Sequence, residues 1–207
     1  MKVLLINGSP HEKGCTYTAL SLIAGELNAS GIETEILHVG GQPVGGCIGC
    51  GGCRKTGSGC VFGGVVNEAI EKAKTADAFV FGSPVHYASA AGNMASFMDR
   101  LAYAGGKYLA YKPAAICCSA RRAGTTTTLD QLVKYPQFFH MPLVNGSYWA
   151  MVHGSDPEQV LQDAEGCAVM QELGRNMAWL LRCIEAGKAA GIQHPENPRR
   201  PMTNFIR

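Results

Sequence analysis

The sequence predicts a doubly wound α/β fold, in which a parallel sheet carries helices on both faces. Short apolar runs of strand length alternate with longer amphipathic stretches of helical period along most of the 207 residues. With 46% hydrophobic and 16% charged residues, the chain is also long enough to bury one core. We therefore expect a single domain over residues 1–186 and an extended C-terminal tail over residues 187–207.

The expected elements follow one another as five strand–helix units and so predict a five-stranded parallel sheet. The strands are the apolar runs KVLLI at 2–6, ETEILHV at 33–39, AFVFG at 78–82, AAICC at 114–118 and a short run at 141–144. The helices are expected at 16–29, 65–75, 92–103, 129–138 and about 157–186. Right-handed crossovers bring the loops after the strands to one edge of the sheet, where ligands bind.

Charge and length exclude several classes of function. Eighteen basic and sixteen acidic residues give a net charge of +2, which leaves no strong field for nucleic acid or an anionic membrane. Small-molecule partners are expected instead. The first apolar run, Val3–Ile6, is too short for a signal peptide or a membrane span, and nine cysteines without an export signal fit a reducing compartment. We expect a cytoplasmic protein, with Cys117 and Cys118 in the core.

Four cysteines lie within fourteen residues of a glycine-rich loop at 46–62. They follow the pattern CxxCxxCxxxxxxC and are Cys47, Cys50, Cys53 and Cys60. Glycines between them let the backbone turn tightly around a [4Fe–4S] cluster, whose irons are bound by four thiolates. Zinc also accepts four thiolates, but its structural sites usually pair two CxxC knuckles across a longer spacer. Zinc and unmetallated thiols remain the alternatives.

The loop after the first strand, NGSPHEKGCTYT, lies between a buried strand and the start of a helix. Free amides and partial positive charge at a helix N-terminus suit a phosphate, with hydroxyls from Ser9 and Thr16 in reach. Neither GxxxxGK[ST] nor GxGxxG is present, which disfavours an ATPase or a dinucleotide domain and favours a mononucleotide. The alternative is a helix capped by Thr16 after a turn at Gly14.

Two motifs resemble a known family. GSPHEKGCT after the first strand, and GSPVHYAS with a following helix that ends in FMDR, resemble the NADPH-dependent FMN reductase family of flavodoxin-like proteins. The resemblance spans most of residues 1–150. Together with the four cysteines after the second strand, it resembles the iron–sulfur flavoprotein branch of that family.

The resemblance implies a set of FMN-binding residues in three loops. The phosphate loop would be Ser9, His11, Gly14, Cys15 and Thr16, and one wall of the isoalloxazine pocket would be Pro84, Val85, His86, Tyr87 and Ser89. The other wall would be Ser119, Arg121, Arg122, Gly124 and Thr125, where the two arginines meet the pyrimidine ring of reduced flavin. Without a flavin, the two arginines are a solvated turn before a helix capped by Thr125 or Thr126.

Two positions depart from the pattern of the family. His86 stands where relatives often carry an aromatic residue, and Cys15 stands where they carry Asn or Ser. Neither change alters a site built on backbone groups. No side chain is assigned a catalytic role, because the chemistry would occur at N5 of the flavin.

The resemblance implies an FMN-dependent oxidoreductase that passes electrons to a small acceptor such as oxygen, peroxide, a quinone or free flavin. In the cluster branch a ferredoxin-type donor supplies single electrons, and in the reductase branch NAD(P)H supplies hydride. The choice between NADPH and NADH stays open, and a flavodoxin-type electron carrier is the non-enzymatic alternative. Apolar stretches such as FMDRLAYAGGKYLAY, MAWLL and the ending TNFIR suggest a homodimer or homotetramer.

Overall fold

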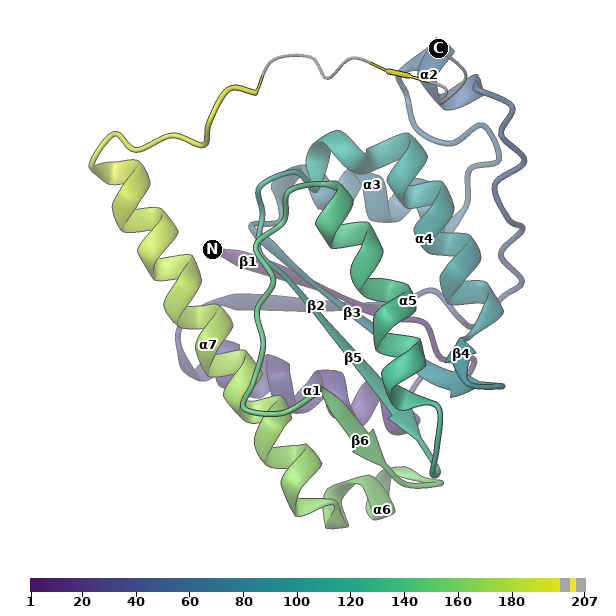
Figure 1. The fold of residues 1–207 in the computed structure, drawn as a ribbon, viewed down its shortest axis with the longest axis vertical. Helices are drawn as coiled ribbons and strands as arrows, with labels where there is room; N and C mark the ends of the chain where they lie inside the picture. Colours follow the sequence, from purple (N-terminus) through teal and green to yellow (C-terminus); the bar gives the residue numbers. More distant parts are fainter. Residues whose placement is uncertain (198–201, 204–207) are drawn as a thin grey trace.

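The computed structural model describes residues 1–197 and 202–203, and it confirms the doubly wound α/β fold. Five parallel strands lie in the order β2-β1-β3-β5-β6. Their bounds are β1 (Lys2–Asn7), β2 (Glu33–His38), β3 (Ala78–His86), β5 (Ala114–Ala120) and β6 (Met151–His153). A two-residue strand, β4 (Ser89–Ala90), turns back antiparallel on the end of β3 (Figure 1).

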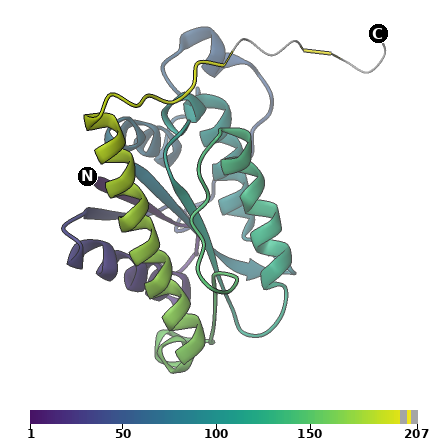
Figure 2. The same cartoon turned by 60° about the vertical axis from the view of Figure 1, so that its left-hand side comes forward.

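Helices cover both faces of the sheet because successive strand residues point to opposite sides. On one face, Val3 and Leu5 of β1 belong to the core formed with α1 (Cys15–Ala29), α6 (Pro157–Gln162) and α7 (Ala164–Ala189). On the other, Leu4 and Ile6 belong to the core formed with α3 (Val65–Thr75), α4 (Gly92–Gly105) and α5 (Thr125–Phe138) (Figures 1 and 2). Two short helices, α2 (Gly52–Thr56) and the 3-10 turn η1 (Gly106–Tyr108), lie outside this pattern.

The core contains the two cysteines that the sequence assigns to it. Cys117 and Cys118 on β5 are both fully buried, which confirms the prediction. Burial raises the pKa of the Cys118 thiol to about 12 and also raises the pKa of Cys117. Both side chains are therefore neutral packing residues rather than redox-active thiols.

The fifth strand is not where the sequence places it. The run 141–144 is a loop that makes one bridge, Leu143 to Ala114, and the strand itself is Met151–His153. Pro142 lacks the N–H that a strand ladder needs, so pairing in this segment does not propagate. The chain returns to β5 only at Cys118, which pairs with Met151.

Two helices also differ from their predicted bounds. The stretch expected as one helix from 157 is divided at Asp163, whose carboxylate accepts hydrogen bonds from Gly166 N (2.9 Å) and His153 N (2.7 Å). Asp163 therefore caps the start of α7 and connects that helix to β6.

Helix α5 begins at Thr125, four residues before the predicted start. Helix α7 continues to Ala189, so residues 187–189 of the predicted tail are helical.

The C-terminal segment packs partly on the body of the protein. His194 stacks on Tyr111 with ring centroids 4.4 Å apart, and Tyr111 also stacks on His140. Four of the five residues of the predicted assembly segment TNFIR, 204–207, and residues 198–201 of the tail lie outside the described residues. In the described part of the chain, no helix is both long enough and apolar enough to cross a membrane.

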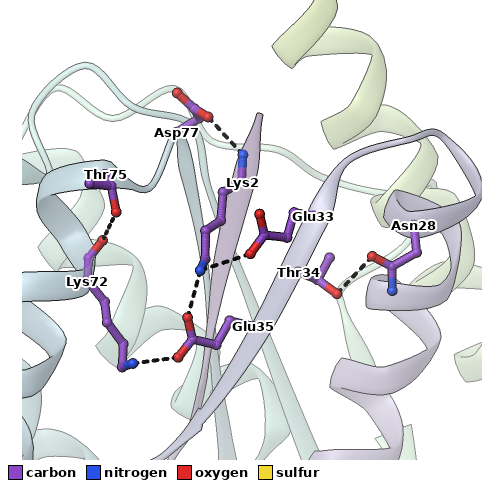
Figure 3. Close-up of polar contacts among 8 residues, drawn as sticks. All are labelled: Lys2, Asn28, Glu33, Thr34, Glu35, Lys72, Thr75 and Asp77. Carbon is purple, nitrogen blue, oxygen red and sulfur yellow. Dashed lines mark hydrogen bonds and ion pairs between the residues drawn. The ribbon is translucent and has the colours of Figure 1, made fainter.

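An ionic network joins the outer strand to helix α3 (Figure 3). Glu35 on β2 pairs with Lys72 of α3 (2.6 Å) and with Lys2 of β1 (2.9 Å). Lys2 also reaches Glu33, and its backbone N–H donates to Asp77. Hydrogen bonds first from Lys72 and then from Lys2 lower the pKa of Glu35.

The network predicts a pH-dependent contribution to stability. Because the pKa of Glu35 is lower in the folded state than in the unfolded chain, its contribution is complete above the unfolded value of 4.5 and is lost as pH falls through the folded pKa. We expect Glu35→Gln to lower the free energy of unfolding at pH 7 by less than about 1 kcal/mol, as for exposed ion pairs. Urea unfolding of both proteins at pH 7 and pH 3 measures the difference, which should shrink at pH 3. A gap that widens with acid would contradict this assignment.

Candidate functional site

The loop between β1 and α1 is held in place by side chains beneath it. Ser9 is buried, its N–H donates to the Asn7 carboxamide oxygen (3.1 Å), and its hydroxyl accepts from His11 N (3.1 Å). Asn7 also donates to the Glu12 carbonyl (2.9 Å). From the end of β2, the His38 ring contacts the Ser9 carbonyl at 2.7 Å. The loop has a fixed shape before any ligand is considered.

Helix α1 begins without a side-chain cap. Gly14, not Thr16, occupies the N-cap position, and no side chain caps the first-turn amides. The alternative of a helix capped by Thr16 is therefore wrong. The Thr16 hydroxyl instead makes a 2.8 Å hydrogen bond to the Ser119 hydroxyl at the end of β5, where both side chains are buried. The first-turn amides and their partial positive charge are left for an anion.

Cys15 is half-buried beside the same loop. Its thiol lies 3.6 Å from the Gly154 carbonyl, to which it donates, and burial raises its pKa. A raised pKa leaves little thiolate at neutral pH, so this cysteine has the character of a packing residue rather than of a nucleophile.

The exit of β3 forms a strained hairpin. Tyr87 and Ala88 have positive φ angles of 48° and 57° at its two-residue turn, a conformation that usually takes Asn or Gly. Gln131 of α5 holds the return strand, since its side-chain oxygen accepts from the Ser89 hydroxyl (2.6 Å) and from Ala90 N (2.9 Å). Pro84 and Val85 are half-buried, whereas His86 and Tyr87 are exposed. The hairpin thus presents an uncovered tyrosine at the carboxyl edge of the sheet.

The loop after β5 lies directly against this hairpin. A Cβ added to Gly124 would lie 2.6 Å from the Ala88 Cα and 2.9 Å from Val85 Cγ1, and the φ of Gly124 is +90°. Only glycine fits both constraints. Gly124 is also the N-cap of α5, so the Thr125 or Thr126 cap expected without a flavin is wrong. Arg121 and Arg122 are exposed beside it, and Thr125 is buried.

The structure therefore brings the three predicted FMN loops to one edge of the sheet. The Thr16–Ser119 hydrogen bond joins the first loop to β5, and the Gly124 contact joins the β5 exit to the hairpin. This arrangement fits a flavin mononucleotide: an uncapped helix start for the phosphate, and two facing loops with two arginines for the ring. The individual binding roles stay predictions.

The cysteine loop leaves that edge, contrary to the expectation that all loops after the strands gather there. It starts beside the phosphate loop, where a Cβ on Gly40 would lie 2.1 Å from the Ser9 carbonyl oxygen. Asn93 at the start of α4 then fixes it, donating to the carbonyls of Gly40 and Gln42 and accepting from Val44 N. The chain continues along α4 to α2, which lies far from the carboxyl ends of the strands in both views (Figures 1 and 2).

All four predicted ligands line one cavity of about 420 Å³ at the far end of α4. Cys47 and Cys50 are exposed, and Cys53 and Cys60 are half-buried. Asn67 of α3 fixes the last of them by two hydrogen bonds to its backbone, from Cys60 N (2.8 Å) and to Cys60 O (3.0 Å). Arg100 Nε donates to the Cys60 sulfur at 3.2 Å.

The donor set of this cavity fits an iron–sulfur cluster. Over residues 1–197 and 202–203, no group of three or more His, Cys, Asp and Glu side chains is placed to hold a metal ion. In a four-cysteine cluster each thiolate binds a different iron, so the sulfurs surround a larger body than one ion. All four cysteines line one cavity and a cationic group donates to one sulfur, so the chemistry of this donor set suits a cluster. Occupation by a cluster stays a prediction.

Residues 1–156 match the family of NADPH-dependent FMN reductases. The chain belongs to this family. Membership of this family makes it an FMN-dependent oxidoreductase, in agreement with the motifs GSPHEKGCT and GSPVHYAS. A relative named as an iron–sulfur flavoprotein, from Methanocaldococcus jannaschii, is 28% identical over 89% of this chain and 100% of its own length. An iron–sulfur flavoprotein of Archaeoglobus fulgidus is 35% identical over 48% of each chain.

Solved structures show the same fold at low identity. RosB with the bound intermediate 8-demethyl-8-formylriboflavin-5'-phosphate superposes with a TM-score of 0.70 at 14% identity, and the match covers 100% of this chain and 95% of RosB. An archaeal flavodoxin gives 0.59 at 14% identity, covering 88% and 99%. An NADH:FMN oxidoreductase in its apo form gives 0.62 at 18% identity, covering 88% and 89%. The flavodoxin-like architecture of this family member is thus established.

Several residues that shape the two sites were missed by sequence reasoning. They act through contacts between segments far apart in the chain, and they are Asn7, His38, Asn67, Asn93, Arg100 and Gln131. Asn7 and Arg100 lie within the motifs NGSP and FMDR, so the sequence could have drawn attention to them. No motif marks the other four residues as part of a site.

The contact at Gly124 generates a prediction about FMN binding. Gly124→Ala places a methyl group against the Ala88 backbone and strains a left-handed residue, so we expect a loss of about 1–3 kcal/mol in stability and weaker FMN retention. Thermal unfolding and flavin absorbance after gel filtration measure both. Gly25→Ala is the matched control, because a Cβ there meets nothing within 4 Å. Equal flavin content in the two variants would contradict the role of this contact.

Proposed function

We propose that this FMN reductase family member carries a [4Fe–4S] cluster on its cysteine loop and uses FMN to pass electrons to a small acceptor. The observation that carries the proposal is the single cavity lined by all four cysteines, with Arg100 bonded to one sulfur. Similarity to iron–sulfur flavoproteins, one of which is covered over its full length, supports it.

The residues of the carboxyl edge would hold FMN in the following way. The uncapped start of α1 and the loop around Ser9 take the phosphate. The hairpin and the loop at Gly124 take the ring, and the exposed guanidinium groups of Arg121 and Arg122 supply positive charge toward its pyrimidine side. When bound, FMN supplies hydride or single-electron exchange at N5. The protein then contributes orientation and charge, and no side chain acts as acid or base.

The two sites lie at opposite ends of α4. Asn93 fixes the loop near the carboxyl edge, whereas Cys53 contacts the Tyr103 carbonyl ten residues later, about 15 Å along the helix axis. An electron relay within one chain would have to cover this separation. We propose that assembly shortens it, with the cysteine cavity of one copy facing the flavin edge of another in a homodimer or homotetramer. A ferredoxin-type protein would be the electron donor, and oxygen, peroxide, a quinone or free flavin the acceptor.

The second candidate is a cluster-free NAD(P)H-dependent reductase of FMN, quinones or azo compounds. The exposure of Cys47 and Cys50 favours it, because thiols open to solvent can serve redox or structural roles without metal. NADPH and NADH are both consistent with the geometry of the carboxyl edge.

Metal and flavin content of protein purified without oxygen tests the proposal. We expect about four irons per FMN in the native chain. Cys53→Ser should lose the iron and keep the FMN, since no residue of the predicted flavin loops lines the cysteine cavity of the same chain. Cys183→Ser, which changes an exposed cysteine on α7, is the control and should keep both.

Other results decide between the candidates. FMN without iron in the native chain, together with rapid bleaching of the flavin by NADPH, would replace the cluster proposal by the cluster-free reductase. Zinc in place of iron would also reject the cluster proposal. Loss of FMN from Cys53→Ser would show that the two sites are not separate.

The separation of the sites also predicts the oligomeric state. Light scattering of the loaded protein should give at least a dimer, because a monomer leaves each cavity far from any flavin edge. The proposed assembly would be contradicted if the loaded protein were a monomer and dithionite still reduced its FMN faster in the native chain than in Cys53→Ser, which lacks the iron.

A further inference from the structure

Arg100 is a buried cation without a carboxylate partner. Arg100 lies on the third turn of α4 and is only 7% exposed, although its side chain carries a full positive charge. Its guanidinium donates to Cys60 Sγ (3.2 Å), to the Gly45 carbonyl (3.4 Å) and to the Gly63 carbonyl (2.8 Å), and the Phe62 ring lies 5.7 Å from Cζ. Among the described residues it forms no ion pair with Asp or Glu. Burial of such a charge is unfavourable unless an anion compensates it.

Among residues 1–197 and 202–203, no carboxylate forms an ion pair with Arg100. The adjacent carboxylate, Asp99, instead accepts a hydrogen bond from Tyr135 at 2.6 Å. No acidic residue lines the cysteine cavity, which Arg54 and Lys107 also border. The groups there that become anionic when they bind iron are the four cysteines. Iron-bound thiolates would therefore be the groups that compensate the charge of Arg100.

We propose that Arg100 is the counter-charge of the four-cysteine site and that it raises the reduction potential of that site. This inference rests on the proposed function. An electron added to the site adds negative charge, and a buried cation in contact with a ligand sulfur stabilises the reduced state more than the oxidised one. The hydrogen bond to Cys60 acts in the same direction, as donors to ligand sulfurs do. Arg100 is thus a positioning and tuning residue, not a catalytic one.

A purely structural role makes a different prediction. The same guanidinium holds the carbonyls of Gly45 and Gly63, which precede and follow the four cysteines, so it also closes the base of the loop. If closure were its whole contribution, its removal would lower iron content or stability and leave the potential of the remaining sites unchanged. The reduction potential therefore separates the two roles.

The test uses the full chain, loaded with iron and FMN and kept without oxygen. The variants are Arg100→Gln, which keeps donors and removes the charge, and Arg100→Lys, which keeps the charge and removes the planar fork. Arg54→Gln is the matched control, because Arg54 borders the same cavity but is exposed to solvent. The electron paramagnetic resonance signal of the reduced site is followed in a dithionite titration with redox mediators.

We expect Arg100→Gln to lower the ratio of reduced to oxidised site at a fixed ambient potential by about tenfold, which is 59 mV for one electron. Arg100→Lys and Arg54→Gln should stay within about twofold of the native chain, the latter because solvent screens an exposed charge. An unchanged potential in Arg100→Gln, or an equal shift in Arg100→Lys, overturns the inference.

Three further outcomes are also decisive. If Arg100→Gln yields no folded protein, Arg100→Met is compared with Arg100→Lys, since both remove the planar fork and only Met removes the charge. A reduced-to-oxidised ratio about tenfold lower in Arg100→Met than in Arg100→Lys supports charge compensation, and equal ratios overturn it. If the native chain binds FMN but no iron, the proposed cluster fails and the inference fails with it. If the native chain holds iron and the potential of Arg100→Gln is unchanged, only the inference fails.

Discussion

The central sheet is packed with apolar side chains on both faces, and this constraint determines where chemistry can occur. Alternate residues of β1 serve two cores, one with α1 and α7 and the other with α3, α4 and α5. Polar ligands therefore have no access to the faces of the sheet. They bind where strands end and helix N-termini expose free amides, at the carboxyl edge. The position of the FMN loops follows from this packing rather than from any one residue.

Close contacts between loops then give that edge its shape. The Thr16–Ser119 hydrogen bond and the approach of Gly124 to Ala88 fix three separate connections relative to one another. The positive φ angles at Tyr87 and Ala88 are unfavourable for these residue types, and Gln131 holds the hairpin that contains them. A site built in this way is ordered before its ligand arrives, which lowers the entropic cost of binding.

The cysteine loop follows a different physical rule. It is a long connection whose position is set by side chains of two helices, Asn93 and Arg100 from α4 and Asn67 from α3. These hydrogen bonds hold the loop so that the four thiols lie far from the predicted flavin loops. They also place the buried guanidinium of Arg100 beside the Cys60 sulfur. The charge of Arg100 and the proposed cluster are thus parts of one electrostatic arrangement, and the remoteness of the cavity from the flavin edge is what makes assembly part of the proposed function.

The sequence by itself determined the fold class, because strand and helix periods are local and the apolar runs on β1, β3 and β5 are unambiguous. It also indicated the family and where the strand-end loops predicted to bind FMN lie, because those depend on short motifs next to strand ends. It placed the fifth strand at 141–144, where Pro142 interrupts pairing, and it missed the break at Asp163, since both depend on contacts with β5 and β6. Only the tertiary structure decided where the cysteines lie and what Arg100 meets, because hydrogen bonds between residues forty or more positions apart leave no pattern in the local sequence.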